Sequence, residues 1–290
     1  MNTAAKLCAY GAVLALVAGG AWVLGGAVGP VGDAGAPAQE RAAHGDPHGG
    51  TVAEAEHIEE PAGLASSRGG YTFTPTRTTF TPGTTETFTF RITGPDGHAL
   101  TRFETEHEKR MHLIVVRRDT AEFQHLHPEL RPDGTWAVPL TLGMPGTYRA
   151  FADFVPAGGE ATTLGVDLAA PGEFRPASHE PSRVATVDGY TVRLDGDLVA
   201  GRSSKLTLTI TRDGRPLTDL QPYLGADGHL VALRTGDLAY LHVHPGDDSA
   251  GGPAITFHAE VPSAGTYRLF LDFRHRDVVR TAGFTVEGHA

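Results

Sequence analysis

The chain has 290 residues, of which 40% are hydrophobic and 20% charged, and a formal net charge of −10; this length allows two ordinary domains, each with its own core. The acidic balance and the lack of a Lys/Arg cluster exclude a nucleic-acid-binding footprint, and an acidic surface that contains histidines would sooner attract cations. The single cysteine, Cys8, lies in the N-terminal apolar run, so the rest of the chain has no disulfide, thiolate metal site or cysteine nucleophile.

The N-terminal segment, residues 1–30, predicts export. Residues 7–29 carry no charge, and a run of this length spans the hydrocarbon core of a membrane, about 30 Å thick. It therefore predicts an uncleaved single-pass anchor. A cleaved signal peptide is the alternative, with Lys6 as its positive region and 36–38 (Ala-Pro-Ala) as its cleavage site. Because the nearby positive charge precedes the run, the remainder is expected outside the cytoplasmic membrane, tethered or secreted.

Residues 31–69 are rich in Gly, Ala, Pro and charged residues without periodic apolar positions. This composition predicts a disordered linker between membrane and domains. The linker also contains His44, His48 and His57 beside acidic residues. These histidines are either solvated tail residues or a loose metal-scavenging tether.

From Tyr71 onward the chain repeats itself. MHLIVV, EFQHLHP and PGTYRAFADF recur in the same order as GHLVAL, AYLHVHP and AGTYRLFLDF. Because the period is near 119 residues, which is too long for a solenoid repeat, each copy is expected to be a whole domain. We predict one domain over 70–172, a linker over 173–186 and a second domain over 187–290.

Each copy predicts short strands separated by Gly, Pro and Asp turns. The segments 85–92 (TETFTFRI) and 205–210 (KLTLTI) alternate strictly, and no window shows sustained helical periodicity. About seven strands in about 100 residues favour an all-β fold, a tandem repeat of two immunoglobulin-like antiparallel β-sandwiches. Tyr148 and Tyr267, in the two GTYR sequences, resemble the tyrosine corner of that fold.

The histidines of the first copy are predicted to converge. If residues 111–117 and 122–128 form adjacent strands joined by a four-residue turn, His112 lies opposite His127, and His125 projects from the same face. Opposite Cβ atoms are about 5 Å apart and neighbours on one face about 7 Å, so three imidazoles can close onto one ion with bonds of about 2 Å.

The second copy predicts the same arrangement. The equivalent turn sets His229 opposite His244, with His242 on the same face. The sequence leaves open whether the two sites are separate or meet across an interface. It also leaves open a structural role, in which the histidines are hydrogen-bonded residues beside the core.

A carboxylate is placed to join each triad from the neighbouring strand. Asp153 and Asp272 each follow the GTYR tyrosine by five residues. Each is either a metal ligand or an acceptor that orients a histidine, or else caps a loop or pairs with Arg149 or Arg268. His98, His107, His258 and His275 lack counterparts in the other copy and are expected to be surface residues.

Imidazole and carboxylate groups suit Cu(II) and Zn(II), so copper or zinc is the expected ion. On these triads and sandwiches, the chain resembles exported bacterial copper-handling proteins, in which small immunoglobulin-like sandwiches carry a few histidines for a metal. It also resembles a set of secreted proteins with an HxHP signature. The copper proteins often bind through an N-terminal histidine or a Met-rich segment, which these domains lack.

Two other functions remain open at this stage. A three-histidine zinc could activate water, but no nucleophile elbow or phosphate loop accompanies it, so we do not expect an enzyme. The alternative to metal binding or buffering is a metal-free, membrane-tethered interaction or scaffold module with structural histidines.

Overall fold

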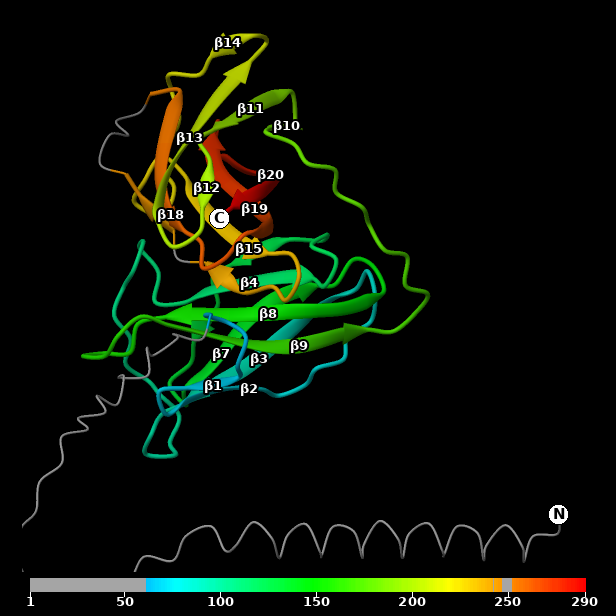
Figure 1. Ribbon diagram of the computed structural model, residues 1–290. Helices are drawn as coiled ribbons and strands as arrows, with labels where there is room; N and C mark the ends of the chain where they lie inside the picture. Colours follow the sequence, from blue (N-terminus) through cyan, green and yellow to red (C-terminus); the bar gives the residue numbers. More distant parts are fainter. Residues whose placement is uncertain (1–60, 242, 247–251) are drawn as a thin grey trace, which may run out of the picture. The chain divides into compact units, whose positions relative to one another are not determined.

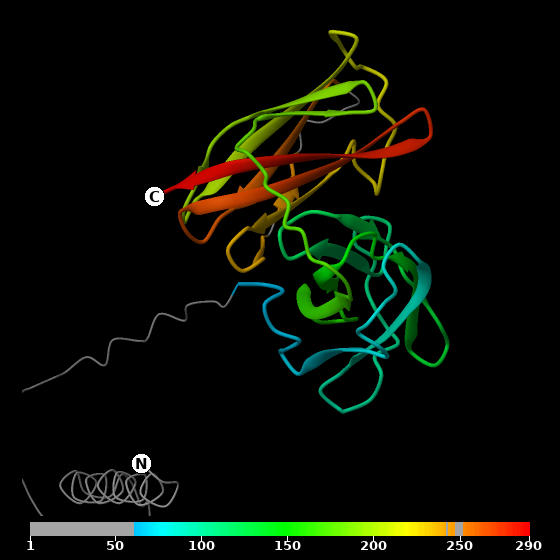
Figure 2. The same ribbon diagram turned by 90° about the vertical axis from the view of Figure 1, so that its right-hand side faces the viewer.

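The computed structural model describes residues 61–241, 243–246 and 252–290, and the expected membrane segment over 7–29 lies outside them. The described part is all-β, with no helix. None of its segments is therefore a helix long and apolar enough to cross a membrane. Figures 1 and 2 show the strands of the first copy in cyan to green and those of the second in yellow-green to red.

The strands of the first copy are β1 (Ser67–Arg68), β2 (Tyr71–Pro75), β3 (Thr85–Thr93), β4 (His112–Arg117), β5 (Gln124–Leu126), β6 (Glu129–Leu130), β7 (Thr135–Thr141), β8 (Gly146–Phe154) and β9 (Thr162–Ala170). Those of the second copy are β10 (Val184–Val187), β11 (Tyr190–Asp195), β12 (Leu198–Val199), β13 (Ser203–Arg212), β14 (Arg215–Pro216), β15 (His229–Arg234), β16 (Tyr240–Leu241), β17 (Val243–Pro245), β18 (Ala254–Glu260), β19 (Gly265–His275) and β20 (Val278–His289).

Each copy consists of two sheets. In the first copy the orders are β1-β2-β3-β7-β6 and β5-β4-β8-β9; in the second they are β10-β11-β13-β18-β17 and β12-β20-β19-β15-β16. In both copies the strands that correspond to C, F and G of an immunoglobulin domain share one sheet, and those that correspond to A, B and E share the other. The prediction of two all-β copies is therefore confirmed.

The sandwich interiors follow from alternation along the strands. In β3, Phe88, Phe90 and Ile92 are fully buried while the intervening residues are exposed or half-buried. The tyrosine corners are present as well. The Tyr148 hydroxyl donates to the Met144 carbonyl at 2.7 Å, and the Tyr267 hydroxyl donates to the Ser263 carbonyl at 2.6 Å.

Strand β4 is buried along its whole length because both of its faces are covered. Leu113 and Val115 face the interior of the first sandwich. Ile114 and Val116 face a third apolar cluster, the interdomain core, to which both copies contribute. Its buried members are Ile114, Val116, Phe151, Val231, Leu233, Leu238 and Phe270, with Phe123 and Tyr240 packed against them.

The two copies contact each other through equivalent faces, as the subunits of an isologous dimer do. Phe123 stacks on Phe270 with ring centroids 4.0 Å apart, and its counterpart Tyr240 lies 5.6 Å from Phe151, the counterpart of Phe270. The faces expected to carry the histidines are therefore these contact faces, and they do not line the interior of either sandwich.

Residues 61–69 are folded, so the expectation of a disordered linker up to residue 69 is wrong for them. Gly63 and Leu64 supply carbonyl oxygens to the buried Arg149 guanidinium at 2.7 Å each, and β1 pairs with β2. These carbonyl oxygens complete the hydrogen bonding of the Arg149 guanidinium, which would otherwise be buried with only Asp167 as a partner. Residues 31–60 lie outside the described residues. Strand β10 likewise begins within the segment 173–186 that was expected to be a linker.

Candidate metal centre

The hairpin register brings His125 to the same face as His112. Strand β4 pairs with β5 antiparallel, with Leu113 opposite Leu126 and Ile114 opposite His125. This is the register predicted from the turn length. His127 continues the run after the last ladder pair, and its ring centroid lies 5.2 Å from that of His112 and 4.8 Å from that of His125.

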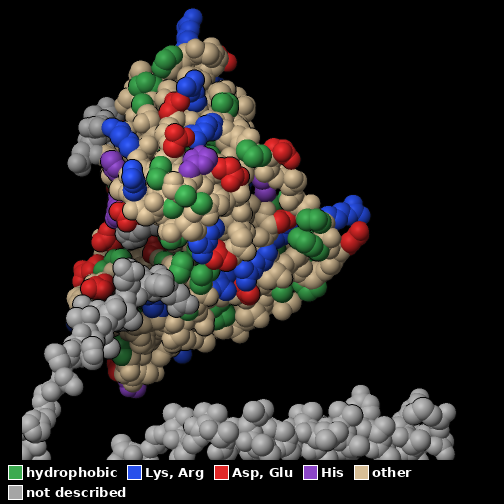
Figure 3. Space-filling model, viewed as in Figure 1, with side chains coloured by type: hydrophobic (Ala, Val, Ile, Leu, Met, Phe, Trp, Pro, Cys, Tyr) green, Lys and Arg blue, Asp and Glu red, His purple; other side chains and the backbone are tan. Residues whose placement is uncertain are grey.

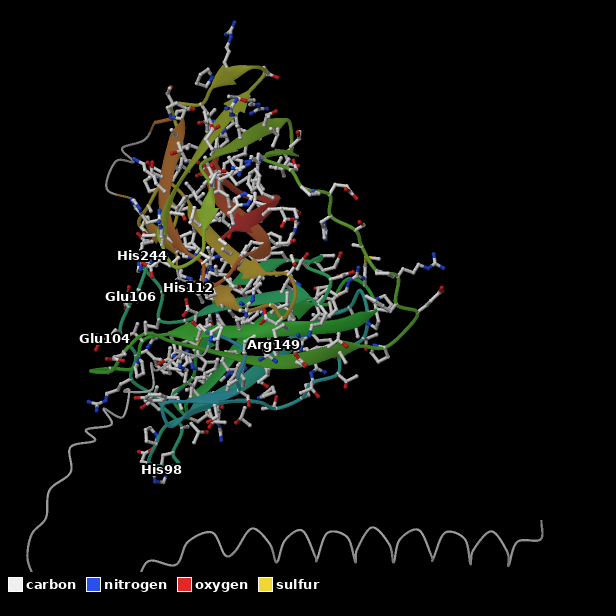
Figure 4. The ribbon with its side chains drawn as sticks, viewed as in Figure 1. His98, Glu104, Glu106, His112, Arg149 and His244 are labelled. Atoms are coloured by element: carbon white, nitrogen blue, oxygen red, sulfur yellow. The ribbon has the colours of Figure 1, made fainter. Side chains whose placement is uncertain are left out.

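Each of two histidines has one ring nitrogen held by an acceptor. The Nε2 atom of His112 lies 3.1 Å from the Glu106 carbonyl oxygen, and Nδ1 of His125 lies 2.8 Å from Oδ2 of Asp272 in the second copy. The other nitrogens of these two rings, Nδ1 of His112 and Nε2 of His125, face one another at 3.0 Å. Figure 4 shows His112 beside the Glu106 loop.

The partners determine which nitrogens carry protons. A carbonyl oxygen and a carboxylate only accept hydrogen bonds, so in neutral rings the protons lie on Nε2 of His112 and Nδ1 of His125. The two nitrogens that face each other at 3.0 Å are then both bare lone pairs. This contact requires a positive charge between them, either an additional proton on one ring or a metal ion.

His127 supplies a third nitrogen to the same place. Its Nε2 atom is buried and has no hydrogen-bond partner among the described residues. One ligand atom from each of His112, His125 and His127 can be chosen so that all three lie within 4.8 Å of one another. In a tetrahedral zinc site the ligand nitrogens are about 3.4 Å apart, so the three rings need to converge only slightly around an ion.

Burial keeps these rings in the form that binds metal. Desolvation, followed by the neighbouring His125, lowers the pKa of His112 to about 4. The same causes, with His112 added, lower the pKa of His127 to about 3. At neutral pH both are uncharged imidazoles, which is the protonation state of a histidine ligand.

His229 of the second copy joins this cluster and does not form a triad of its own. Its ring stacks on that of His112 with centroids 5.3 Å apart and an interplanar angle of 5°, and its centroid lies 4.8 Å from that of His125. Desolvation lowers the pKa of His229 well below the usual range, with His125 as the next cause.

The expected position of His244 opposite His229 is wrong. Strand β16 keeps the predicted register, with Leu233 opposite Tyr240. Strand β16 ends at Leu241, whereas β17, which begins at Val243, belongs to the other sheet and sets His244 opposite His258 on β18. In the first copy β5 continues to Leu126, two residues beyond the equivalent of Leu241, and β6 begins only at Glu129, which leaves His127 in the cluster. His242 lies outside the described residues.

The two aspartates occupy equivalent ladder positions, opposite His229 and His112. Asp272 is buried, contacts His125 across the interdomain contact and accepts a 2.5 Å hydrogen bond from Thr281. Its counterpart Asp153 lies opposite His112 in the ladder and accepts a hydrogen bond from Thr163 at 2.8 Å. Asp272 therefore has the arrangement of an acceptor that orients a histidine ligand.

Two histidines that were expected on the surface are buried or half-buried, and one of them lies at the cluster. His107, expected on the surface, is half-buried, and its ring centroid lies 5.3 Å from that of His229. It has a positive φ of 47°, as does its neighbour Glu108 with 63°, and no pattern in the sequence predicts a left-handed histidine. His275, also expected on the surface, is buried against the Tyr190 hydroxyl at 2.6 Å, away from this cluster.

A protein-family model for a domain of unknown function, DUF8832, matches residues 65–171 and again residues 185–290. The chain belongs to the DUF8832 family. The two DUF8832 domains coincide with the two sandwiches, and the cluster draws on both of them. No curated protein shows significant sequence similarity to the chain.

Solved structures similar to this DUF8832 protein are remote. They include a DUF4426 family protein from Pseudomonas aeruginosa, with 11% identity, a TM-score of 0.27 and coverage of 37% of this chain and 96% of that one. They also include the Escherichia coli adhesin FdeC, with 17% identity, a TM-score of 0.25 and coverage of 77% and 65%. Invasin, a bacterial integrin-binding protein, has 10% identity, a TM-score of 0.25 and coverage of 76% and 40%. The chain thus spans less than two thirds of the adhesin and invasin structures, and no function follows from similarity at these scores.

Proposed function

We propose that this protein binds one Cu(II) or Zn(II) ion at His112, His125 and His127. The observation that carries the proposal is the pair of bare imidazole nitrogens that face each other at 3.0 Å, together with a ligand atom of His127 that lies within 4.8 Å of a ligand atom on each of the other two rings. One metal ion accepts all three lone pairs, whereas one additional proton satisfies only the first two.

The chemistry of the donors favours these two metals. Imidazole nitrogens suit copper and zinc, and hydrogen bonds from ligand histidines to a carboxylate and a backbone carbonyl are typical of their sites. Met111 lies one residue from His112 but packs into the core of the first sandwich. It therefore does not add a thioether that would favour Cu(I).

The role we propose is binding or buffering of the metal outside the cytoplasmic membrane, without catalysis. The location is supported by the apolar run over 7–29 and its preceding Lys6. On the face shown in Figure 3, basic and acidic side chains are interspersed.

A metal-free interaction module is the second candidate. It is favoured by the contact between His125 and Asp272, whose side chains are 2% and 3% exposed. If the additional proton lies on His125, the pair becomes a buried interdomain ion pair, and the histidines hold the two copies together without a metal. The cluster then shapes a rigid two-domain surface for another protein.

Isothermal titration of the purified full-length protein with CuCl₂ and ZnCl₂ separates the two candidates. We expect one ion per chain, and for Cu(II) an electron paramagnetic resonance spectrum with nitrogen hyperfine structure. The double variant H125Q/H127Q should lose this binding. H98Q, which changes an exposed histidine at the far end of the first copy (Figure 4), should retain it. If the wild-type protein binds neither ion, the metal-binding proposal is wrong and the metal-free interaction module is the function that the structure supports.

A further inference from the structure

His229 is the one histidine of the second copy whose ring lies in the cluster among the described residues. It begins β15, opposite Asp272 on β19, and is the counterpart of His112. The planes of the two rings are parallel, and their centroids are 5.3 Å apart. Two histidines bound to one tetrahedral ion have ring centroids about 5 Å apart. His229 meets this spacing with His125, at 4.8 Å, and with His112, at 5.3 Å. Its nitrogens do not belong to the set of ligand atoms that lie within 4.8 Å of one another, so its ring must turn toward the ion to bind it.

The His229 ring has no hydrogen bond to any described side chain or carbonyl; its contacts are with the rings of His107, His112 and His125. A buried histidine with a purely structural role normally has partners for its ring nitrogens. His112 and His125 have such partners, namely the carbonyl oxygen of Glu106 and the carboxylate of Asp272. His229 therefore still has a lone pair to offer.

A strained turn of the first copy packs against His229 through the ring of His107. Glu106 and Lys109 exchange both backbone hydrogen bonds, at 2.8 and 2.9 Å, around His107 and Glu108, which both have positive φ. The equivalent turn of the second copy uses Leu224 and Gly225, so the first copy does without the glycine that would relieve the strain. Such strain costs about 1 to 3 kcal/mol per residue and is typical of ligand sites. This turn places both the Glu106 carbonyl and the His107 ring against the cluster.

We propose that the metal centre is shared between the two copies, with His229 as the fourth ligand, so that the ion cross-links the two domains. This rests on the proposed metal binding at His112, His125 and His127 and extends it to the second copy. The triad is complete only on the first copy, and the fourth nitrogen is present only when the copies are in contact. The ion therefore binds the docked arrangement more tightly than a separated one and stabilises it by mass action.

The test uses the full-length protein with ZnCl₂ as the probe, and compares wild type, H229Q and the control H98Q. Zinc affinity is measured by competition with a chromogenic chelator. We expect H229Q to bind zinc 10- to 100-fold more weakly and H98Q to bind as wild type. Hydrogen exchange supplies a second readout. Zinc should slow exchange in both β4 and β15 of the wild type, but in H229Q only in β4.

X-ray absorption at the zinc edge of the wild type keeps the test informative if H229Q does not fold. The proposal requires scattering from four imidazoles. Three imidazoles with a water, or unchanged affinity and exchange in H229Q, overturn the shared centre while the triad stands. No zinc binding by the wild type overturns both the shared centre and the metal function.

Discussion

His125 of the first copy lies 2.8 Å from the carboxylate of Asp272 in the second copy, and both side chains are almost completely buried. Because a buried group left without its partner is strongly destabilising, we expect D272N to lower the free energy of unfolding by about 2 to 4 kcal/mol. It should also weaken metal binding about 10- to 100-fold, because the carboxylate orients His125.

Urea denaturation and chelator competition measure the two effects. D167N is the control, since the exposed Asp167 pairs with Arg118 and Arg149 and with no triad histidine. Equal losses of metal affinity in D167N and D272N would contradict the role assigned to Asp272.

Stability should fall as pH falls below neutral. The pKa of His112 is lowered to about 4 and that of His127 to about 3, whereas in the unfolded chain both are near 6.5. Between these values the unfolded state binds protons that the folded state does not. The stability is therefore fully present above about pH 6.5 and is lost as pH falls toward 4, at up to about 1.4 kcal/mol per histidine per pH unit.

The measurement is urea denaturation between pH 7.5 and 4.5 in the presence of a chelator. H127Q, which removes one of the two groups, should give a shallower decline with pH than the wild type. A decline of the same slope in both proteins would show that His127 does not contribute.

The tyrosine corners should contribute equally in the two copies. Y148F and Y267F each remove a hydroxyl that donates to a backbone carbonyl four residues upstream. We expect each to lower the free energy of unfolding by about 1 kcal/mol, the typical net contribution of one hydrogen bond. Differential scanning calorimetry measures the loss, and metal affinity should stay unchanged because neither hydroxyl touches the cluster.

Removal of one aromatic ring from the interdomain core should weaken metal binding from a distance. F123A deletes the ring that stacks on Phe270 at 4.0 Å, and deletion of a packed phenylalanine costs up to about 3 to 5 kcal/mol. If the ion is shared between the copies, part of this loss should appear as weaker zinc affinity in a chelator competition. F88A, inside the first sandwich, is the comparison and should affect stability more than affinity.

The local geometry of the site could be predicted from the sequence because it depends on short-range rules. A four-residue turn set the register of β4 and β5, and alternation set His112, His125 and His127 on one face. The change of sheet between β16 and β17 could not be predicted. It depends on where β17 finds its partner in β18, and the two copies have the same HxHP sequence there.

The meeting of the two copies also could not be predicted. Ile114, Val116, Val231 and Leu233 read as core residues, and their apolar character is the same whether they cover a sandwich interior or a domain contact. His107 reached the cluster through a left-handed backbone that sequence patterns assign to glycine or asparagine. The prediction therefore described one triad in each copy and left open whether they meet, whereas the structure forms one cluster from both copies.

The contact between equivalent faces has a further consequence because the copies are joined in one chain. In a dimer of identical subunits, every substitution on the contact face would appear twice, and His112 and His229 would have identical surroundings. In one chain each position changes once, so the first copy can keep His127 while the second moves His244 away. The connection also makes the encounter intramolecular: dilution, which dissociates a dimer, leaves this pair of faces together.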